Sequence, residues 1–232
     1  MRNTRLAVIL LAGLIPACAP QISRPPQPQQ QAPGNFPDSY YQQALARGEP
    51  VFRVDPDRSI VLVEVRRAGS LARFGHDHVV ASRDLRGYVT LGEGRSDLYV
   101  QLDRLEVDEP ALRAEAGFDA RPSEADIAGT RRNMLEKVLE TGRYPFALIH
   151  VSKLDAGRSG PVLNVEITLH GITRALQIPA QIETGADQIG VTGRLALDQT
   201  DFGISPFSIL GGAIQVQDRV ELRFRIRARR ID

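Results

Sequence analysis

The stretch VELRFRIRAR, residues 220–229, contains the clearest structural signal in this chain. Apolar residues occupy every second position, and one glutamate and four arginines fill the positions between them. Because successive side chains of a strand point to opposite faces, this period of two predicts a strand with one apolar face and one face in water. Strands of this kind are typical of antiparallel sheets, in which one face covers a core.

The same alternation recurs from residue 51 onward, which indicates many strands rather than one. It is found in residues 61–65, 98–103, 163–170, 176–182 and 189–198. Short turns that contain glycine separate several of these runs, at residues 92–94, 156–157 and 185–187. A sheet that closes on itself has no exposed edges and can hold one small ligand. The sequence therefore predicts an all-β fold, an antiparallel β-barrel.

One segment between the strands follows a helical period instead. Ser123 stands three residues before Asp126, which is a weak form of the capping box that begins helices. Apolar residues then recur at helical spacing as far as Gly142, a residue type that favours the left-handed conformation at a helix end. A shorter helix is expected over residues 110–116. The barrel therefore carries a helical insertion, and strands and insertion form one domain.

Composition excludes several classes of protein. The 232 residues carry 29 lysines and arginines against 28 aspartates and glutamates, and this balance excludes the strongly basic surface of a general nucleic-acid binder. A single cysteine excludes an intrachain disulfide and a zinc site built from several cysteines. No apolar run approaches the ~20 residues that a membrane-spanning helix needs. Nucleotide-binding glycine loops and the serine elbow of hydrolases are also absent from the sequence.

The first residues have the pattern of a secretory signal. Arg2 and Arg5 precede an apolar run that ends at Ile15, and a proline and an alanine lead to Cys18. This pattern resembles a bacterial lipoprotein signal, although Pro16 departs from the commoner small residue. Residues 1–18 are therefore predicted to be signal and lipobox, with Cys18 as the acylated anchor to a membrane facing the periplasm, the outer membrane in this interpretation. The alternative is an incidental thiol beyond an ordinary signal.

Residues 19–48 are predicted to form a disordered linker. Six prolines and five glutamines interleave between residues 20 and 37, and such a composition cannot bury a core. A spacer between membrane and domain is favoured over a proline-rich recognition motif. The barrel domain is then expected over residues 49–232.

Four stretches in order carry a resemblance to a known family. They are residues 51–63, the segment 133–147 with its Tyr144-Pro145 pair, the hairpin 163–173 that ends LHGIT, and the DFGI element at 201–204. Together they resemble the YceI-like family, lipocalin-like barrels of bacterial envelopes that are associated with binding polyisoprenoid lipids. The resemblance covers roughly residues 50–228.

The resemblance implies an envelope lipoprotein that binds an isoprenoid-like or other long-chain lipid inside its barrel, without a cofactor and without catalysis. A barrel lumen is a concave, mostly apolar site of the kind that holds ligands. The side chains expected to line it are Val61, Val63, Phe74, Leu148, Val165, Phe202 and Phe207. Inward aliphatic residues look alike in an open and a packed lumen, so a scaffolding barrel filled by its own side chains remains an alternative.

The segment RFGHDHVV, residues 73–80, departs from the apolar-aromatic stretch of many relatives and resembles a histidine-containing branch. His76 and His78 are two residues apart, which on a strand places both imidazoles on one face. They could bind a metal ion with a third ligand from His150, His170 or a carboxylate. This supports the alternative of a metal-binding or redox-linked envelope enzyme. The other interpretation is a polar turn, with His150 in the core and His170 in a hairpin.

Overall fold

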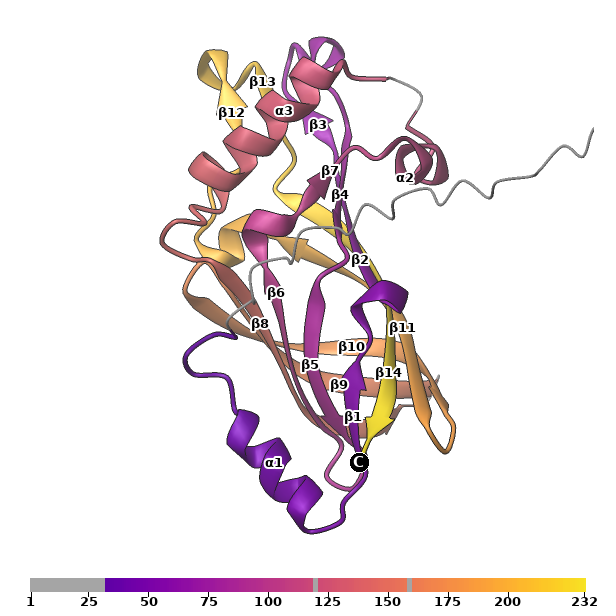
Figure 1. Cartoon of the computed structure of the whole chain (residues 1–232). Helices are drawn as coiled ribbons and strands as arrows, with labels where there is room; N and C mark the ends of the chain where they lie inside the picture. The colour runs from indigo at the N-terminus through magenta and orange to yellow at the C-terminus, as the bar shows by residue number, and fades with distance from the viewer. Residues whose placement is uncertain (1–31, 119–120, 158–159) are drawn as a thin grey trace, which may run out of the picture. The chain divides into compact units, whose positions relative to one another are not determined.

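The computed structural model describes residues 32–118, 121–157 and 160–232, so the predicted signal, Cys18 and the first part of the linker lie outside the described residues. In the described part, eight strands close into an antiparallel ring in the order β1-β5-β6-β8-β9-β10-β11-β14, and β14 also pairs with β1 (Figure 1). The predicted all-β, antiparallel barrel is thus confirmed. The ring strands are β1 (Val51–Val54), β5 (Leu85–Thr90), β6 (Arg95–Gln101), β8 (Phe146–Gly157), β9 (Gly160–Leu169), β10 (Ile172–Thr184), β11 (Gln188–Asp198) and β14 (Arg219–Ile231).

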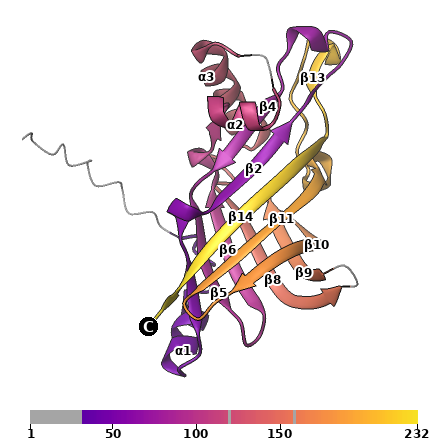
Figure 2. The same ribbon diagram turned by 90° about the vertical axis from the view of Figure 1, so that its right-hand side faces the viewer.

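The long strand β14, which contains the alternating stretch 220–229, organises the sheet. Its C-terminal half pairs with β1, and its N-terminal half pairs with β2 (Ile60–Val65). From β2 the sheet continues to β4 (His78–Ser82) and the short β7 (Glu106–Val107). A second small sheet joins β12 (Ser208–Ile209), β13 (Ile214–Val216) and β3 (Arg67–Ala68). Figure 2 shows this small sheet at the end of the barrel opposite the C-terminus.

The alternation in β14 separates a core face from an ion-paired face. Leu222 is in register with Val63 of β2 and Leu195 of β11, and all three pack in one hydrophobic cluster. The next residue, Arg223, points to the other face and forms an ion pair with Glu64, with 3.2 Å between Nη2 and Oε1. The arginines in the phase of Arg223, at positions 225, 227 and 229, therefore lie on the outside of the barrel, as expected for the wet face of an antiparallel sheet.

The linker prediction is wrong at its C-terminal end, because α1 (Asp38–Ala46) belongs to the folded domain. Tyr41 and Ala44 are both 0% exposed and form a cluster with Val51 on the outer face of β1. The prolines and glutamines that indicated disorder end at Pro37, and the tyrosines that follow bury enough apolar surface to order the helix. The folded domain therefore begins before residue 49.

The helical insertion is confirmed, with differences in its details. Besides α2 (Pro110–Glu115), which covers the outer face of β2 and β4, it contains α3 (Glu124–Asn133) followed by a π-helix over Met134–Val138. Ser123 and Asp126 form both hydrogen bonds of a capping box. The helix ends earlier than predicted: Glu140, and not Gly142, has a positive φ, of 45°. No helix in the described part of the chain is long and apolar enough to cross a membrane.

The hairpin between β9 and β10 explains two of the motifs. His170 and Gly171 form its two-residue turn with φ values of 52° and 77°, so His170 is the predicted hairpin residue. The Tyr144 ring lies 4.4 Å from the His170 ring, and a Cβ on Gly171 would lie 2.8 Å from Cε1 of Tyr144. Glycine is needed there for both its backbone conformation and its small size.

Candidate functional site

The interior of the barrel is lined by aliphatic side chains that remain half-buried. They project from alternate positions of neighbouring strands and pack within the hydrophobic clusters of the barrel. The half-buried set on the strands comprises Val61, Val63, Val65, Ile149, Ile167, Leu169, Val191, Leu195, Leu222, Phe224 and Ile226. Side chains that face inward and still retain accessible surface indicate a lumen that the protein does not fill completely.

Other parts of the interior are tightly packed. One buried group contains Phe52, Val54 and Leu85, and another contains Val151, Val165 and Ile178. These groups bound the half-buried lining and give the barrel a close-packed core of the ordinary kind. The accessible part of the lumen is therefore apolar on its walls and has packed side chains around it.

Four of the predicted lumen residues pack in the interior clusters of the barrel. Val61 and Val63 of β2 belong to the half-buried lining. Val165 of β9 is buried against Val151, and Phe202 is 2% exposed in the cluster that also contains Val63. Phe202 follows β11 in a short 3-10 helix that ends at Gly203, whose φ of 67° lets the chain turn. The DFGI motif thus places an aromatic ring against the lumen lining.

Three predicted lumen residues lie elsewhere. Phe74 is 62% exposed in a 3-10 helix after β3, so it is a surface residue. Leu148 and His150 lie on the same face of β8, and His150 contacts Asp97 on the outside of the barrel. Ile149, between them, packs in the lumen cluster, so Leu148 is on the outer face. Phe207 is half-buried in the loop before β12. Period alone identified the wrong face of β8, because both faces of that strand carry apolar residues.

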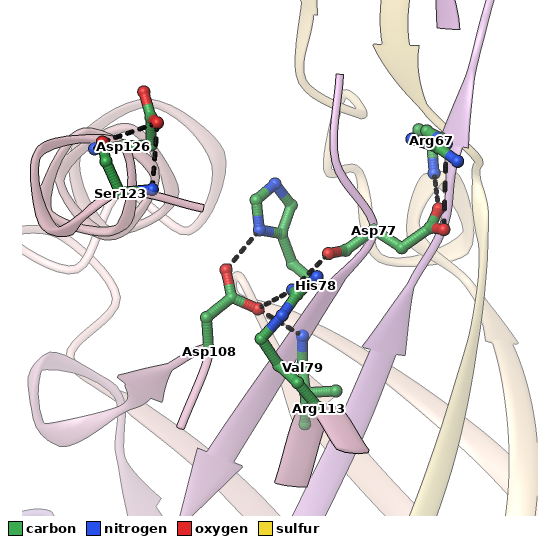
Figure 3. A network of polar contacts seen from close by, with 8 residues as sticks. All are labelled: Arg67, Asp77, His78, Val79, Asp108, Arg113, Ser123 and Asp126. Carbon is green, nitrogen blue, oxygen red and sulfur yellow. Dashed lines mark hydrogen bonds and ion pairs between the residues drawn. The ribbon is translucent and has the colours of Figure 1, made fainter. Parts of the chain in front are cut away.

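A buried polar network stands where β4 begins (Figure 3). The Asp108 carboxylate lies 2.6 Å from His78 Nδ1 and accepts hydrogen bonds from the Val79 N–H at 3.0 Å and from Arg113 Nη1 at 2.6 Å. Arg113 Nη1 also donates to the backbone carbonyl of Asp77. The network joins β4 to the segment after β7 and to α2, which follow each other in the chain about 30 residues after β4.

The electrostatics of this network favour a charged Asp108. Burial by itself would raise the pKa of this carboxyl, but the hydrogen bonds and charges of His78, Val79 and Arg113 outweigh burial, so its pKa lies below the usual value. The side chain is fully buried and its backbone has a φ of 60°. Asp108 and Arg113 were not recognised from the sequence, because nothing in the linear spacing connects them to residue 78.

The metal hypothesis for His76 and His78 lacks a third ligand in the described part of the chain. The two rings are 6.3 Å apart at an angle of 75°, and His78 uses Nδ1 on Asp108. No group of three or more His, Cys, Asp or Glu side chains among the described residues is arranged to hold a metal ion. His76 keeps a buried Nδ1 for which the described residues supply no hydrogen-bond partner. The other two histidines are committed separately: His150 to Asp97 and His170 to Glu140.

A second buried network lies outside the barrel beneath α1, and no pattern in the sequence indicated it. Asp97 accepts hydrogen bonds from the Tyr41 hydroxyl at 2.7 Å and from Arg95 Nε at 2.8 Å, and its Oδ1 is 2.6 Å from His150 Nδ1. Burial would raise the pKa of Asp97, but these three hydrogen bonds lower it below the usual value. His150 was predicted to be a core residue, and this prediction is wrong: it is half-buried on the outer face.

A closed antiparallel ring of eight strands around an apolar lumen defines a lipocalin-like barrel, a class of proteins whose site is the interior of the sheet. The family model of the YceI-like domain matches residues 52–228. The chain therefore belongs to the YceI-like family, as the resemblance in the sequence indicated.

Two solved structures illustrate the similarity of fold. A polyisoprenoid binding domain from Saccharophagus degradans implicated in plant cell wall breakdown superimposes with a TM-score of 0.53 at 14% identity, covering 78% of this chain and 98% of that one. BcnA from Burkholderia cenocepacia gives a TM-score of 0.52 at 12% identity, covering 75% and 98% of the two chains. At these identities the likeness concerns the fold alone. No curated protein sequence matches the chain significantly.

Proposed function

We propose that this protein binds a long apolar lipid of the isoprenoid type inside its barrel and carries out no reaction on it. The observation that carries the proposal is the half-buried state of inward-facing side chains such as Val63, Ile149 and Leu195. A lumen filled by the protein's own side chains would bury these groups almost completely. Accessible apolar walls favour an apolar ligand, since each CH₂ removed from water contributes about 0.8 kcal/mol.

Family membership supports the same function. The polyisoprenoid binding domain from Saccharophagus degradans has the same fold and covers most of this chain. A barrel whose lumen is lined by aliphatic side chains offers a flexible hydrocarbon chain many weak contacts and few directional ones. Binding is therefore expected to select for length and apolar character rather than for one headgroup.

The proposal includes attachment of the protein to the cell envelope through an acylated Cys18, facing the periplasm at the outer membrane. It is supported by the basic residues, apolar run and cysteine at the start of the sequence. We expect Cys18→Ser to prevent incorporation of labelled palmitate and to shift the protein to the soluble fraction or leave its signal uncleaved. Palmitate incorporation that persists in this variant would show that Cys18 is not the acylation site.

The test of lipid binding is native mass spectrometry of protein purified without detergent, before and after addition of farnesol and of a longer polyprenol. The informative variant is Val63→Phe, which adds an aromatic ring to the lumen lining. The matched control is Val162→Phe, which makes the same change at another half-buried position, in β9. Val162 is three residues from the inward-facing Val165, so its side chain points to the opposite face of the strand. An open lumen accepts the ring of Val63→Phe at little cost in stability, and the ring then displaces lipid.

We expect both variants to fold with a change in stability within about 0.5 kcal/mol, and only Val63→Phe to lose most of its bound lipid. A packed lumen would give the opposite result: a loss of stability of about 1–3 kcal/mol for Val63→Phe and no lipid mass in the parent protein. Addition of Zn²⁺ to the same samples tests the enzyme alternative. Sub-micromolar zinc binding that disappears in the His76→Ala, His78→Ala double variant, without any lipid mass, would favour the metal site instead.

A further inference from the structure

Two loops form a projecting tip at the end of the barrel opposite α1. The tip consists of residues 69–75, between β3 and β4, and residues 208–213, which contain β12 and a short 3-10 helix. They are held together by the small sheet β12-β13-β3 and by a hydrogen bond from the Leu71 N–H to the Ala213 carbonyl oxygen at 2.8 Å. Figures 1 and 2 both show these loops at the same end of the molecule, remote from the C-terminus. The tip is therefore one structural unit.

The tip gathers most of the exposed large apolar side chains of the described structure. Four such side chains are exposed, and three of them lie in the tip: Phe74 at 62%, Ile209 at 45% and Leu210 at 70%. Leu210 also has a φ of 52°, a conformation that residues with bulky side chains rarely adopt. The strained backbone at Leu210 costs stability, and the exposed side chain adds no core packing in return. Strain of this kind is typical of residues that make a functional contact.

Within the two loops of the tip, residues 69–75 and 208–213, the one charged side chain is that of Arg73. Residues 66–76 contain three arginines and no acidic residue, and residues 203–217 contain no charged residue at all. Arg66 forms an ion pair with Glu64, and Arg67 forms one with Asp77. The Arg73 guanidinium lies over the Phe74 ring at 4.6 Å. Arg73 thus supplies the positive charge of the tip, beside the exposed Phe74 ring. Apolar side chains together with arginine suit the boundary between acyl chains and anionic headgroups.

The tip also stands beside the lumen. Arg67 of β3 follows two residues after Val65, the last lumen-lining residue of β2, and β13 leads directly into β14. A surface that binds the tip would therefore be held close to this end of the barrel. An acyl chain on residue 18 would tether the protein to a membrane, but a tether through a long linker does not orient the domain.

We infer that the tip is a membrane-docking surface, which inserts Phe74, Ile209 and Leu210 into the interface of an anionic phospholipid bilayer and places the end of the barrel against it. The inference rests on the proposed function for its purpose, since a lipid carrier must meet the membrane that supplies or receives its ligand. Its test does not depend on lipid uptake.

The chain contains no tryptophan, so a single introduced tryptophan reports on one place only. Phe74→Trp places the probe in the tip, and Leu91→Trp is the matched control, because Leu91 is 41% exposed in the β5–β6 turn near α1. Both are made in the full chain with Cys18→Ser, so that acylation does not contribute. The probes are vesicles of phosphatidylethanolamine with phosphatidylglycerol and vesicles of phosphatidylcholine alone, all without isoprenoid.

We expect the emission of Phe74→Trp to shift to the blue and to be quenched by brominated lipid with the anionic vesicles, and the emission of Leu91→Trp to remain unchanged. Adding Arg73→Ser should lower partition into anionic vesicles about fivefold, which corresponds to about 1 kcal/mol, and have little effect with phosphatidylcholine. Docking without lipid uptake would overturn the proposed function but not this inference.

Three results would overturn the docking surface. The first is no shift for Phe74→Trp, and the second is an equal shift for Leu91→Trp. The third is a shift that appears without vesicles and grows with protein concentration, which would mean that a second copy of the chain covers the tip. Lipid uptake that persists in any of these cases would leave the proposed function intact.

Discussion

Replacement of Asp108 by asparagine tests the buried network at the start of β4. Asparagine keeps the shape of the side chain and tolerates the φ of 60°, so the substitution removes the charge and adds little strain. Arg113, whose side chain is 5% exposed, then loses its ion pair with the Asp108 carboxylate. Breaking a buried ion pair by removing one partner costs about 3–5 kcal/mol, and we expect a loss in this range at neutral pH.

The dependence on pH has a definite sign. The pKa of Asp108 in the folded protein is lowered, so the carboxylate stabilises the fold above the unfolded pKa of about 3.9, and this contribution is lost as the pH falls through the folded value. The difference between the parent protein and Asp108→Asn should therefore be constant near neutral pH and shrink in strongly acidic solution. Urea melts at several pH values measure it, provided that the m-value does not change.

Two further variants make this prediction decisive. Asp57→Asn removes an exposed carboxylate and should change stability by less than about 0.5 kcal/mol. Adding Arg113→Met to Asp108→Asn removes the buried cation whose ion pair with residue 108 has been broken, so part of the loss should be recovered. The reasoning would be refuted if Asp108→Asn were as stable as Asp57→Asn. It would also be refuted if the double variant lost as much stability as Asp108→Asn and Arg113→Met lose separately, added together.

Three other substitutions should alter stability, each followed by denaturant melts. Leu135→Ala removes a buried side chain of the π-helix and should cost about 2–5 kcal/mol, whereas a change within about 0.5 kcal/mol would mean that the helix does not pack on the barrel. Tyr41→Phe removes a hydrogen bond to charged Asp97 and should cost about 1.5–3 kcal/mol of stability near neutral pH. Because the folded pKa of Asp97 is lowered, this cost should fade as the carboxylate is protonated in acid. A cost that does not depend on pH would contradict the assignment of this hydrogen bond. Gly171→Ala should cost more than about 1 kcal/mol through its φ of 77° and the nearby Tyr144 ring, and a stabilised variant would contradict this account of the hairpin.

Local periodicity determines much of this fold. The alternation in residues 220–229 identifies the strand and its wet face, because the two faces of β14 differ sharply in chemistry. Ser123 and Asp126 identify a helix start, since a capping box is formed by residues three apart. The LHGIT and DFGI motifs lie in turns, whose geometry depends on neighbouring residues.

Sequence reasoning failed where the decisive partner was remote. Leu148 looked like a lumen residue because every residue from 146 to 149 is apolar, and only the packing of Ile149 in the barrel cluster shows which face points inward. Residues 38–46 follow a proline-rich stretch and were predicted to be disordered, yet the outer face of β1 provides the surface on which Tyr41 is buried.

The sequence by itself thus determined the class of fold, several of its strands and the family. Only the tertiary structure decided that His78 meets Asp108, that His150 meets Asp97, and that Phe74 and Leu210 stand exposed at one end. The physical reason is that alternation and capping depend on residues a few positions apart. Partnerships across 30 or 53 positions depend instead on how the sheet closes, which brings those strands together.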